Sequence, residues 1–191
     1  MSVLEYTSCT MTPVNLKFRN RLRQSYGKGE SMVYRKASME DLEFLTETRV
    51  EVLRAANRLS GDADMSVVRE QSHRYYQRAL CDGTHTAYLA FDGKHFAGAG
   101  GVSYFQVMPT YHNPSGNKAY IMNMYTRPEY RRRGIAYHML ELLVGDAKGR
   151  GITAISLEAT KMGRPLYERY GFTQMRDEME LGEKAQADRK Q

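Results

Sequence analysis

The chain has 191 residues, of which 41% are hydrophobic, and 28 Lys and Arg stand against 22 Asp and Glu. This length fits a single domain, and the 14 Tyr and 6 Phe argue against a disordered chain. The longest uncharged stretch, 95–117, holds two prolines and several polar residues. It cannot span a membrane, because a span needs about 20 mainly apolar residues.

Cysteine usage and the first residues of the chain favour a cytoplasmic protein. Residues 1–20 lack the basic region and the following apolar region of a secretory signal. Cys9 and Cys81 are too few for a disulfide framework, and the five His show no HxxxH or HExxH spacing. We therefore expect free thiols and no metal cofactor.

The net charge of +6 gives little support to nucleic-acid binding. Half of it lies in residues 1–31, where five basic residues stand against two acidic ones. We expect residues 1–31 to be an N-terminal extension, 32–182 to form the domain and 183–191 to be a polar tail. Inside the domain, the dense basic segment is Arg131–Arg133. We do not expect a nucleic-acid partner.

The first part of the domain predicts a strand followed by two helices. Residues 32–37 read as a short strand, and Ser38 with an acid three residues later is typical of a helix start. Apolar residues at helical spacing extend that helix to Ala56. Ser60–Asp62 ends it, and a second, polar helix is expected at about 65–80.

Three strands are expected next. Segments 84–91 and 95–105 are rich in Tyr, Phe, Val and Ala and flank Asp92-Gly93, which is a strong hairpin signal. After a loop, a further strand is expected at 118–126. The second of these strands contains three glycines, which we expect to allow close packing: Gly98, Gly100 and Gly101.

The last part of the chain predicts helices alternating with strands. Residues 133–148 form an amphipathic helix that ends at Gly149 and Gly151. The elements expected after it are a strand, a short helix and a last strand, at 152–159, 165–170 and 173–181. Strand, helix and strand from 118 to 159 imply a parallel crossover in an otherwise antiparallel sheet. The predicted fold class is α+β with a mixed sheet.

A basic segment, Arg131-Arg132-Arg133-Gly134-Ile135-Ala136, lies between a predicted strand and the start of an amphipathic helix. The first turn of a helix has unpaired N–H groups and about +0.5 charge, which suits a phosphate group. Gly134 allows close approach of the backbone, and the arginines add positive charge. An exposed basic turn explains the same residues equally well. P-loop and Rossmann motifs are absent.

Three stretches match one known family in order and spacing. They are Met124-Tyr125-Thr126-Arg127-Pro128-Glu129-Tyr130-Arg131-Arg132-Arg133-Gly134-Ile135-Ala136, Ser156-Leu157-Glu158-Ala159-Thr160 and Leu166-Tyr167-Glu168-Arg169-Tyr170-Gly171-Phe172. Through them, residues 118–172 resemble the GNAT superfamily of acyl-CoA-dependent N-acetyltransferases. The resemblance implies a GNAT-type mixed sheet, mostly antiparallel, with a parallel pair at the centre and helices on its flanks.

The resemblance also implies a binding site for acetyl-CoA. In the family, the loop that matches Arg131, Arg132, Arg133, Gly134, Ile135 and Ala136 wraps the pyrophosphate with backbone amides. The strand edge at Met124, Tyr125 and Thr126 would then bind the pantetheine arm. A bulge in that strand would splay it from strand 152–159 and open a slot for the acyl end.

For catalysis, the resemblance implies that Tyr167 is the acid that protonates the leaving thiolate, with a packed helix tyrosine as the alternative. Glu158 matches the general base of some relatives, and water-mediated deprotonation or a merely solvated Glu158 stay open. The strand segment 120–125 lacks the Glu that other relatives carry there. Where many members have an Asn after the next strand, this chain has Thr160-Lys161.

The implied function is direct transfer of an acetyl group from acetyl-CoA to an amine of a small molecule or peptide, in a ternary complex. The family also allows a homodimer. The acceptor stays open: Arg49, Arg58 and Tyr75 could meet an acidic or aromatic group, or could be solvated helix residues. A non-catalytic acyl-CoA-binding sensor module and a basic nucleic-acid binder are the alternatives.

Overall fold

The computed structural model describes residues 32–176, 178 and 179, which divide into two compact units between Glu158 and Ala159. The expected extension, 1–31, and the expected polar tail, 183–191, lie outside the described residues. None of the described helices is long and apolar enough to cross a membrane.

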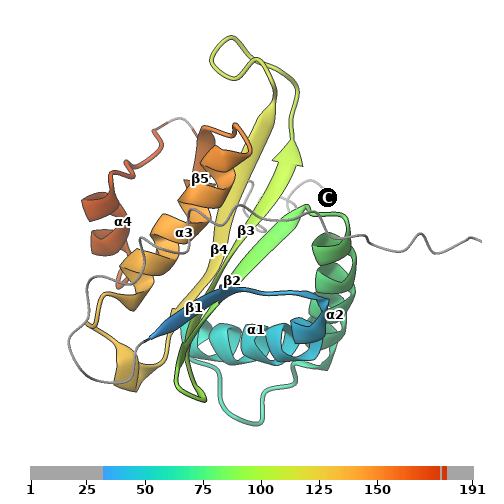
Figure 1. The fold of residues 1–191 in the computed structure, drawn as a ribbon, viewed down its shortest axis with the longest axis vertical. Helices are drawn as coiled ribbons and strands as arrows, with labels where there is room; N and C mark the ends of the chain where they lie inside the picture. Colours follow the sequence, from blue (N-terminus) through green and yellow to red (C-terminus); the bar gives the residue numbers. More distant parts are fainter. Residues whose placement is uncertain (1–31, 177, 180–191) are drawn as a thin grey trace, which may run out of the picture. The chain divides into compact units, whose positions relative to one another are not determined.

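A mixed sheet of five strands is the frame of the first unit (Figure 1). Its strands follow chain order: β1 (Val33–Lys36), β2 (His85–Asp92), β3 (His95–Gln106), β4 (Asn117–Thr126) and β5 (Ala154–Leu157). The first four strands pair antiparallel, and β5 pairs parallel to β4. The α+β prediction with a parallel crossover is therefore confirmed. In the described sheet the parallel pair lies at one edge, with β5 outermost, and not at the centre as the resemblance implied.

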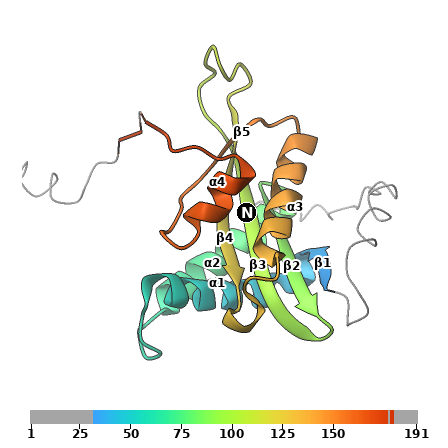
Figure 2. The same ribbon diagram turned by 90° about the vertical axis from the view of Figure 1, so that its left-hand side faces the viewer.

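Two helices cover one face of the sheet, and a third covers the other (Figures 1 and 2). On the first face lie α1 (Leu42–Asn57) and α2 (Ser66–Cys81), and on the second lies α3 (Ile135–Gly149). Ser38 starts the first helical segment as predicted, through a capping box with Asp41. A 3-10 turn, Met39–Asp41, comes before the regular helix.

The glycines of β3 allow close packing, as predicted from the sequence. A Cβ atom at Gly98 would lie 2.6 Å from the carbonyl oxygen of Tyr125 on β4. At Gly100 it would lie 2.6 Å from Cγ of Met139 and 2.9 Å from Cδ1 of Leu143, both on α3. Because Gly98 and Gly100 have no side chain, β4 and α3 can lie close to β3.

The second unit contains α4 (Arg164–Tyr170), which confirms the short helix expected at 165–170. The strand expected at 173–181 is wrong for the part that the structure describes, because residues 173–176, 178 and 179 form no strand. Asp and, less strongly, Glu are depleted in strands, and residues 173–181 contain one Asp and two Glu. The remaining positions of that prediction, 177, 180 and 181, lie outside the described residues.

Candidate active site

Strand β4 carries a bulge at the point where the resemblance implied one. Gly101 of β3 pairs with Met122, whereas Ala99 pairs with Tyr125, so β4 has one residue more than β3 between these pairs. Asn123 sits in this bulge with a φ of 55°, a left-handed conformation that few residues other than glycine adopt. A bulge of this kind bends the strand and redirects its side chains.

Beyond the bulge, β4 and β5 no longer pair. Their parallel ladder runs from Lys118 to Ile121 on β4, opposite Ala154–Leu157 on β5. The outer edge of β4 from Met122 to Thr126 therefore has no partner strand among the described residues of this unit. The predicted residues Met124, Tyr125 and Thr126 lie on this free edge, where backbone groups can bind an extended ligand.

The predicted phosphate loop leads directly into α3. Pro128–Tyr130 forms a 3-10 turn, Arg132 has a φ of 61°, and Gly134 has a φ of 79° at the N-cap of α3. No side chain caps this helix, so the N–H groups of its first turn have no such acceptor. A Cβ at Gly134 would meet no atom within 4 Å, so the backbone conformation, not the available space, favours glycine here.

Two of the three loop arginines are held by backbone carbonyls. Nε of Arg131 donates to the oxygen of Thr126 at 3.2 Å, which ties the loop to the end of β4. Arg133 donates to the oxygen of Glu129 at 3.0 Å and lies over the Tyr130 ring. These contacts keep positive charge beside the uncapped N-terminus of α3, an arrangement that suits an anion.

The free edge of β4 is also anchored to α1, through a residue that the sequence analysis missed. The carboxylate of Glu51 accepts hydrogen bonds from Oη of Tyr125 at 3.1 Å and from Nε and Nη2 of Arg127 at 3.1 and 3.0 Å. The guanidinium of Arg127 in turn lies over the Phe96 ring. Glu51 precedes its partners by more than 70 residues, so no local sequence pattern predicts the contact.

A polar cluster lies under the helices α1 and α2, next to the bulge. Oη of Tyr75 lies 2.5 Å from Oγ of Ser103, and both oxygens lie 3.1 Å from Nδ1 of the buried His85. Arg49 donates to the side-chain oxygen of Asn123 at 3.2 Å. Of this cluster, sequence reasoning singled out only Arg49 and Tyr75, because the others look like ordinary strand residues.

The buried histidine makes the stability of the protein sensitive to mild acid. Burial, together with the charge of Arg49, lowers the pKa of His85 from 6.5 to about 4. An unfolded chain therefore binds a proton between these pH values that the folded chain does not bind. We expect the free energy of unfolding to fall by about 2–3 kcal/mol from pH 7 to pH 4.5, measured by urea denaturation.

A comparison of two variants tests this assignment. His85→Gln should lose most of this decrease, whereas the exposed His95→Gln should keep it. Asp41 and Asp146 have lowered pKa values. Their contributions to the free energy of unfolding are therefore lost mainly below the ordinary Asp pKa of about 3.8, which lies outside the range from pH 7 to pH 4.5. Equal slopes in the wild type and in His85→Gln would contradict the prediction.

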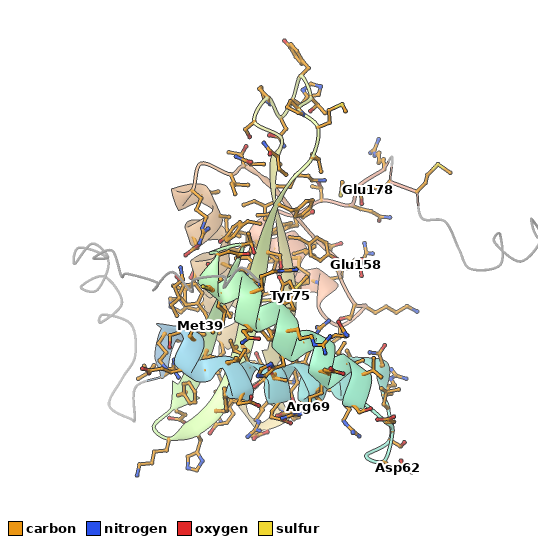
Figure 3. The ribbon with its side chains drawn as sticks, turned by 90° about the vertical axis from the view of Figure 1, so that its right-hand side faces the viewer. Met39, Asp62, Arg69, Tyr75, Glu158 and Glu178 are labelled. Atoms are coloured by element: carbon orange, nitrogen blue, oxygen red, sulfur yellow. The ribbon has the colours of Figure 1, made fainter. Side chains whose placement is uncertain are left out.

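The two predicted catalytic residues lie in different units. Glu158 is exposed and follows the last residue of β5 directly (Figure 3). Tyr167 belongs to α4 of the second unit, where its ring packs edge-on against Phe172. Burial raises the pKa of Tyr167 above its ordinary value, so its hydroxyl stays protonated at neutral pH. Within the described part of the chain, no three His, Cys, Asp or Glu side chains gather as metal ligands do.

Comparisons with known proteins agree with this architecture. The model of the acetyltransferase (GNAT) family matches residues 52–172. A predicted acetyltransferase from Clostridium acetobutylicum, whose crystal structure was solved with acetyl-CoA, is 35% identical, with a TM-score of 0.73 over 80% of this chain and 96% of that one. A GCN5-related N-acetyltransferase from Ralstonia eutropha is 26% identical, with a TM-score of 0.69 over 80% and 98% of the two chains.

More distant similarity extends to glucosamine-6-phosphate N-acetyltransferase from Arabidopsis thaliana, which at 16% identity shares the fold. Its TM-score is 0.60, over 81% of this chain and 99% of that one. No curated protein matches the chain. With the family model covering more than half of its residues, the chain belongs to the GNAT acetyltransferase family.

Proposed function

We propose that the chain is an N-acetyltransferase that binds acetyl-CoA and moves its acetyl group directly to an amine of a small molecule or peptide. Membership of the GNAT family supports acyltransferase activity in general. The observation on which the specific proposal rests is the uncapped N-terminus of α3, with Gly134 at a φ of 79°, beside the free edge of β4.

The residues present fit the pyrophosphate, the pantetheine arm and the acyl end of acetyl-CoA. First-turn amides of α3, preceded by Arg131–Arg133, suit a pyrophosphate, because helix N-termini favour anions. The backbone groups of Met124, Tyr125 and Thr126 suit the amides of a pantetheine arm. Where β4 and β5 stop pairing, after Ile121, the acyl end would have room to meet an amine.

The reaction requires that the amine lose a proton and that the departing sulfur gain one. A lysine-like amine has a pKa of about 10.4, so deprotonation at pH 7 costs about 4.6 kcal/mol. Glu158, directly or through a water molecule, is the candidate to take that proton. Acetyl-CoA, when bound, supplies the acetyl group as a thioester, and Tyr167 is the candidate to give a proton to the departing sulfur. A thiol pKa near 8.5 makes a phenol a workable donor.

Thermal stability with and without acetyl-CoA tests the proposed cofactor site. A ligand at 100 times its Kd that binds only the folded state adds about 2.7 kcal/mol. For a chain of this size, that is a rise in Tm of about 5–11 °C. ATP and NAD should give no comparable rise.

A pair of glycine variants locates the site. Gly134→Ala forces a residue with a Cβ into the left-handed N-cap of α3, and we expect it to abolish most of the rise in Tm. Gly145→Ala changes an exposed glycine of the same helix with no atom within 4 Å, and should keep it. No rise at saturating acetyl-CoA in the wild type would contradict the proposal.

A further inference from the structure

A hollow of about 550 Å³ lies on the side of the sheet that α1 and α2 cover. It is lined by Tyr75, Arg78, Asp82, Thr84, Ser103, Tyr104, Phe105, Tyr120 and Met122. Met122 is the first residue of β4 beyond its pairing with β5, so this hollow adjoins the free edge of β4. Figure 3 shows Tyr75 on α2 in front of the sheet. An amine that approached this edge would place the rest of its molecule in the hollow.

Two guanidinium groups and one carboxylate lie in or beside the hollow. Arg78 lines it, and Arg49 reaches the adjacent bulge, where its guanidinium donates to the side-chain oxygen of Asn123. Neither guanidinium has a carboxylate within 4.0 Å in the described part of the chain. The one acidic residue of the lining, Asp82, accepts hydrogen bonds from the backbone N–H and the hydroxyl of Thr84.

Both guanidinium charges act on the same hydroxyl. Burial raises the pKa of Tyr75 most strongly and the charge of Asp82 raises it further, whereas the hydrogen bond with Ser103 and the charges of Arg78 and Arg49 oppose that rise. The Tyr75 hydroxyl and the Ser103 hydroxyl lie 2.5 Å apart, and Nδ1 of His85 lies within hydrogen-bond distance of both. On the other side of the His85 ring, Nε2 is buried without a partner in the described residues. The result is a fixed pair of hydroxyls in a positive field.

This field disfavours a simple amine as the acceptor. An amine arrives mostly as an ammonium ion, and two unpaired guanidinium groups beside one carboxylate repel it. A second, negative group on the same molecule removes that repulsion and gains charge-assisted hydrogen bonds. A half-buried cation without a carboxylate partner is costly, so a ligand anion would also stabilise Arg49, whose hydrogen bond to Asn123 does not neutralise its charge.

We propose that the hollow binds an anionic group, carboxylate or phosphate, on the same molecule as the amine that is acetylated. Arg78 and Arg49 supply the charge, and the hydroxyls of Tyr75 and Ser103 supply hydrogen bonds. His85 acts as a positioning residue that holds the two hydroxyls. This inference rests on the proposed acetyl transfer and adds the class of acceptor.

Matched amines that differ only in the anion test the inference. The carboxylate pair is phenylalanine with phenylalaninamide, and the phosphate pair is O-phosphoethanolamine with ethanolamine. CoA release gives kcat/KM for each amine. We expect the anionic member of at least one pair to be preferred by about 10-fold to 100-fold, and the preferred pair tells carboxylate from phosphate.

Variants assign the preference to the hollow. Arg78→Gln and Arg49→Gln should each lower the preference about tenfold or more, mainly through KM. Arg74→Gln removes the same charge from an exposed position on α2, where Arg74 pairs with Glu70, and should keep the preference. Arg78 is exposed, so its variant tests the inference even if Arg49→Gln fails to fold.

The outcomes separate this inference from the proposed function. Absence of stabilisation by acetyl-CoA overturns the proposed function and the inference together. Stabilisation by acetyl-CoA with no preference for any anionic amine, or with no anionic amine acetylated at all, overturns the inference alone. A preference that survives both arginine variants also overturns it, because the anion would then bind elsewhere.

Discussion

Replacing Tyr167 by Phe is expected to lower kcat for acetyl transfer by about 10²-fold to 10⁴-fold, the usual contribution of a positioned acid. The substitution removes one hydroxyl and keeps the ring that packs against Phe172. The affinity for acetyl-CoA should stay within about twofold, because the proposed cofactor contacts are backbone groups of β4 and α3. Steady-state kinetics and calorimetric titration of the same preparations measure both quantities.

A matched variant on the same helix is Tyr170→Phe, which removes a hydroxyl three residues further along α4. Its kcat should stay within about threefold of the wild type. An unchanged kcat in Tyr167→Phe would remove the residue from the catalytic site. The sensor alternative has a different signature, since a sensor binds acetyl-CoA and shows no turnover for either variant to reduce.

The framework of the site could be predicted because its signals are local. Glycines inside a strand, a hairpin around Gly93 and a basic loop before an amphipathic helix each constrain a few neighbouring residues. The bulge at Asn123 has no such signal and was expected only from the resemblance. Its left-handed φ of 55° becomes visible only when β3 fixes the register on both sides.

Contacts between distant segments could not be predicted in the same way. Glu51 meets Arg127, and His85 meets Ser103, because the sheet and α1 bring together segments 76 and 18 residues apart. The strand expected at 173–181 is an error of another kind. A strand needs residues suited to a sheet, and the acidic residues of this segment are not.

Replacing Asp146 by Ala is expected to lower the free energy of unfolding by about 3 kcal/mol. Asp146 lies on α3, and its side chain is only 12% exposed. It accepts hydrogen bonds from the hydroxyls of Tyr104 and Thr86 at 2.6 and 3.2 Å, and from Arg150 at 2.9 Å and Lys36 at 3.0 Å. Burial alone would raise the pKa of Asp146, yet these donors hold it below its ordinary value.

The size of the loss follows from what remains after the substitution. Thr86 is fully buried, and the Tyr104 hydroxyl would lose its carboxylate acceptor, each at about 1–3 kcal/mol. Arg150 and Lys36 are more exposed and can turn to water, so their share is small. Glu141→Ala, which removes an exposed carboxylate paired with His138 on the same helix, should cost less than about 0.5 kcal/mol.

The same variant separates the stability of the fold from the function of the site. Asp146 lies eleven residues from the start of α3, which is about 16 Å along a helix. Its partners come from β1, β2, β3 and the end of α3, and none lies in the loop Arg131–Ala136. Well below its lowered Tm, the folded Asp146→Ala protein should therefore bind acetyl-CoA with a Kd within about twofold of the wild type. A large loss of affinity in the folded variant would mean that the cluster also sets the conformation of the loop, because α3 would then transmit the change from one of its ends to the other.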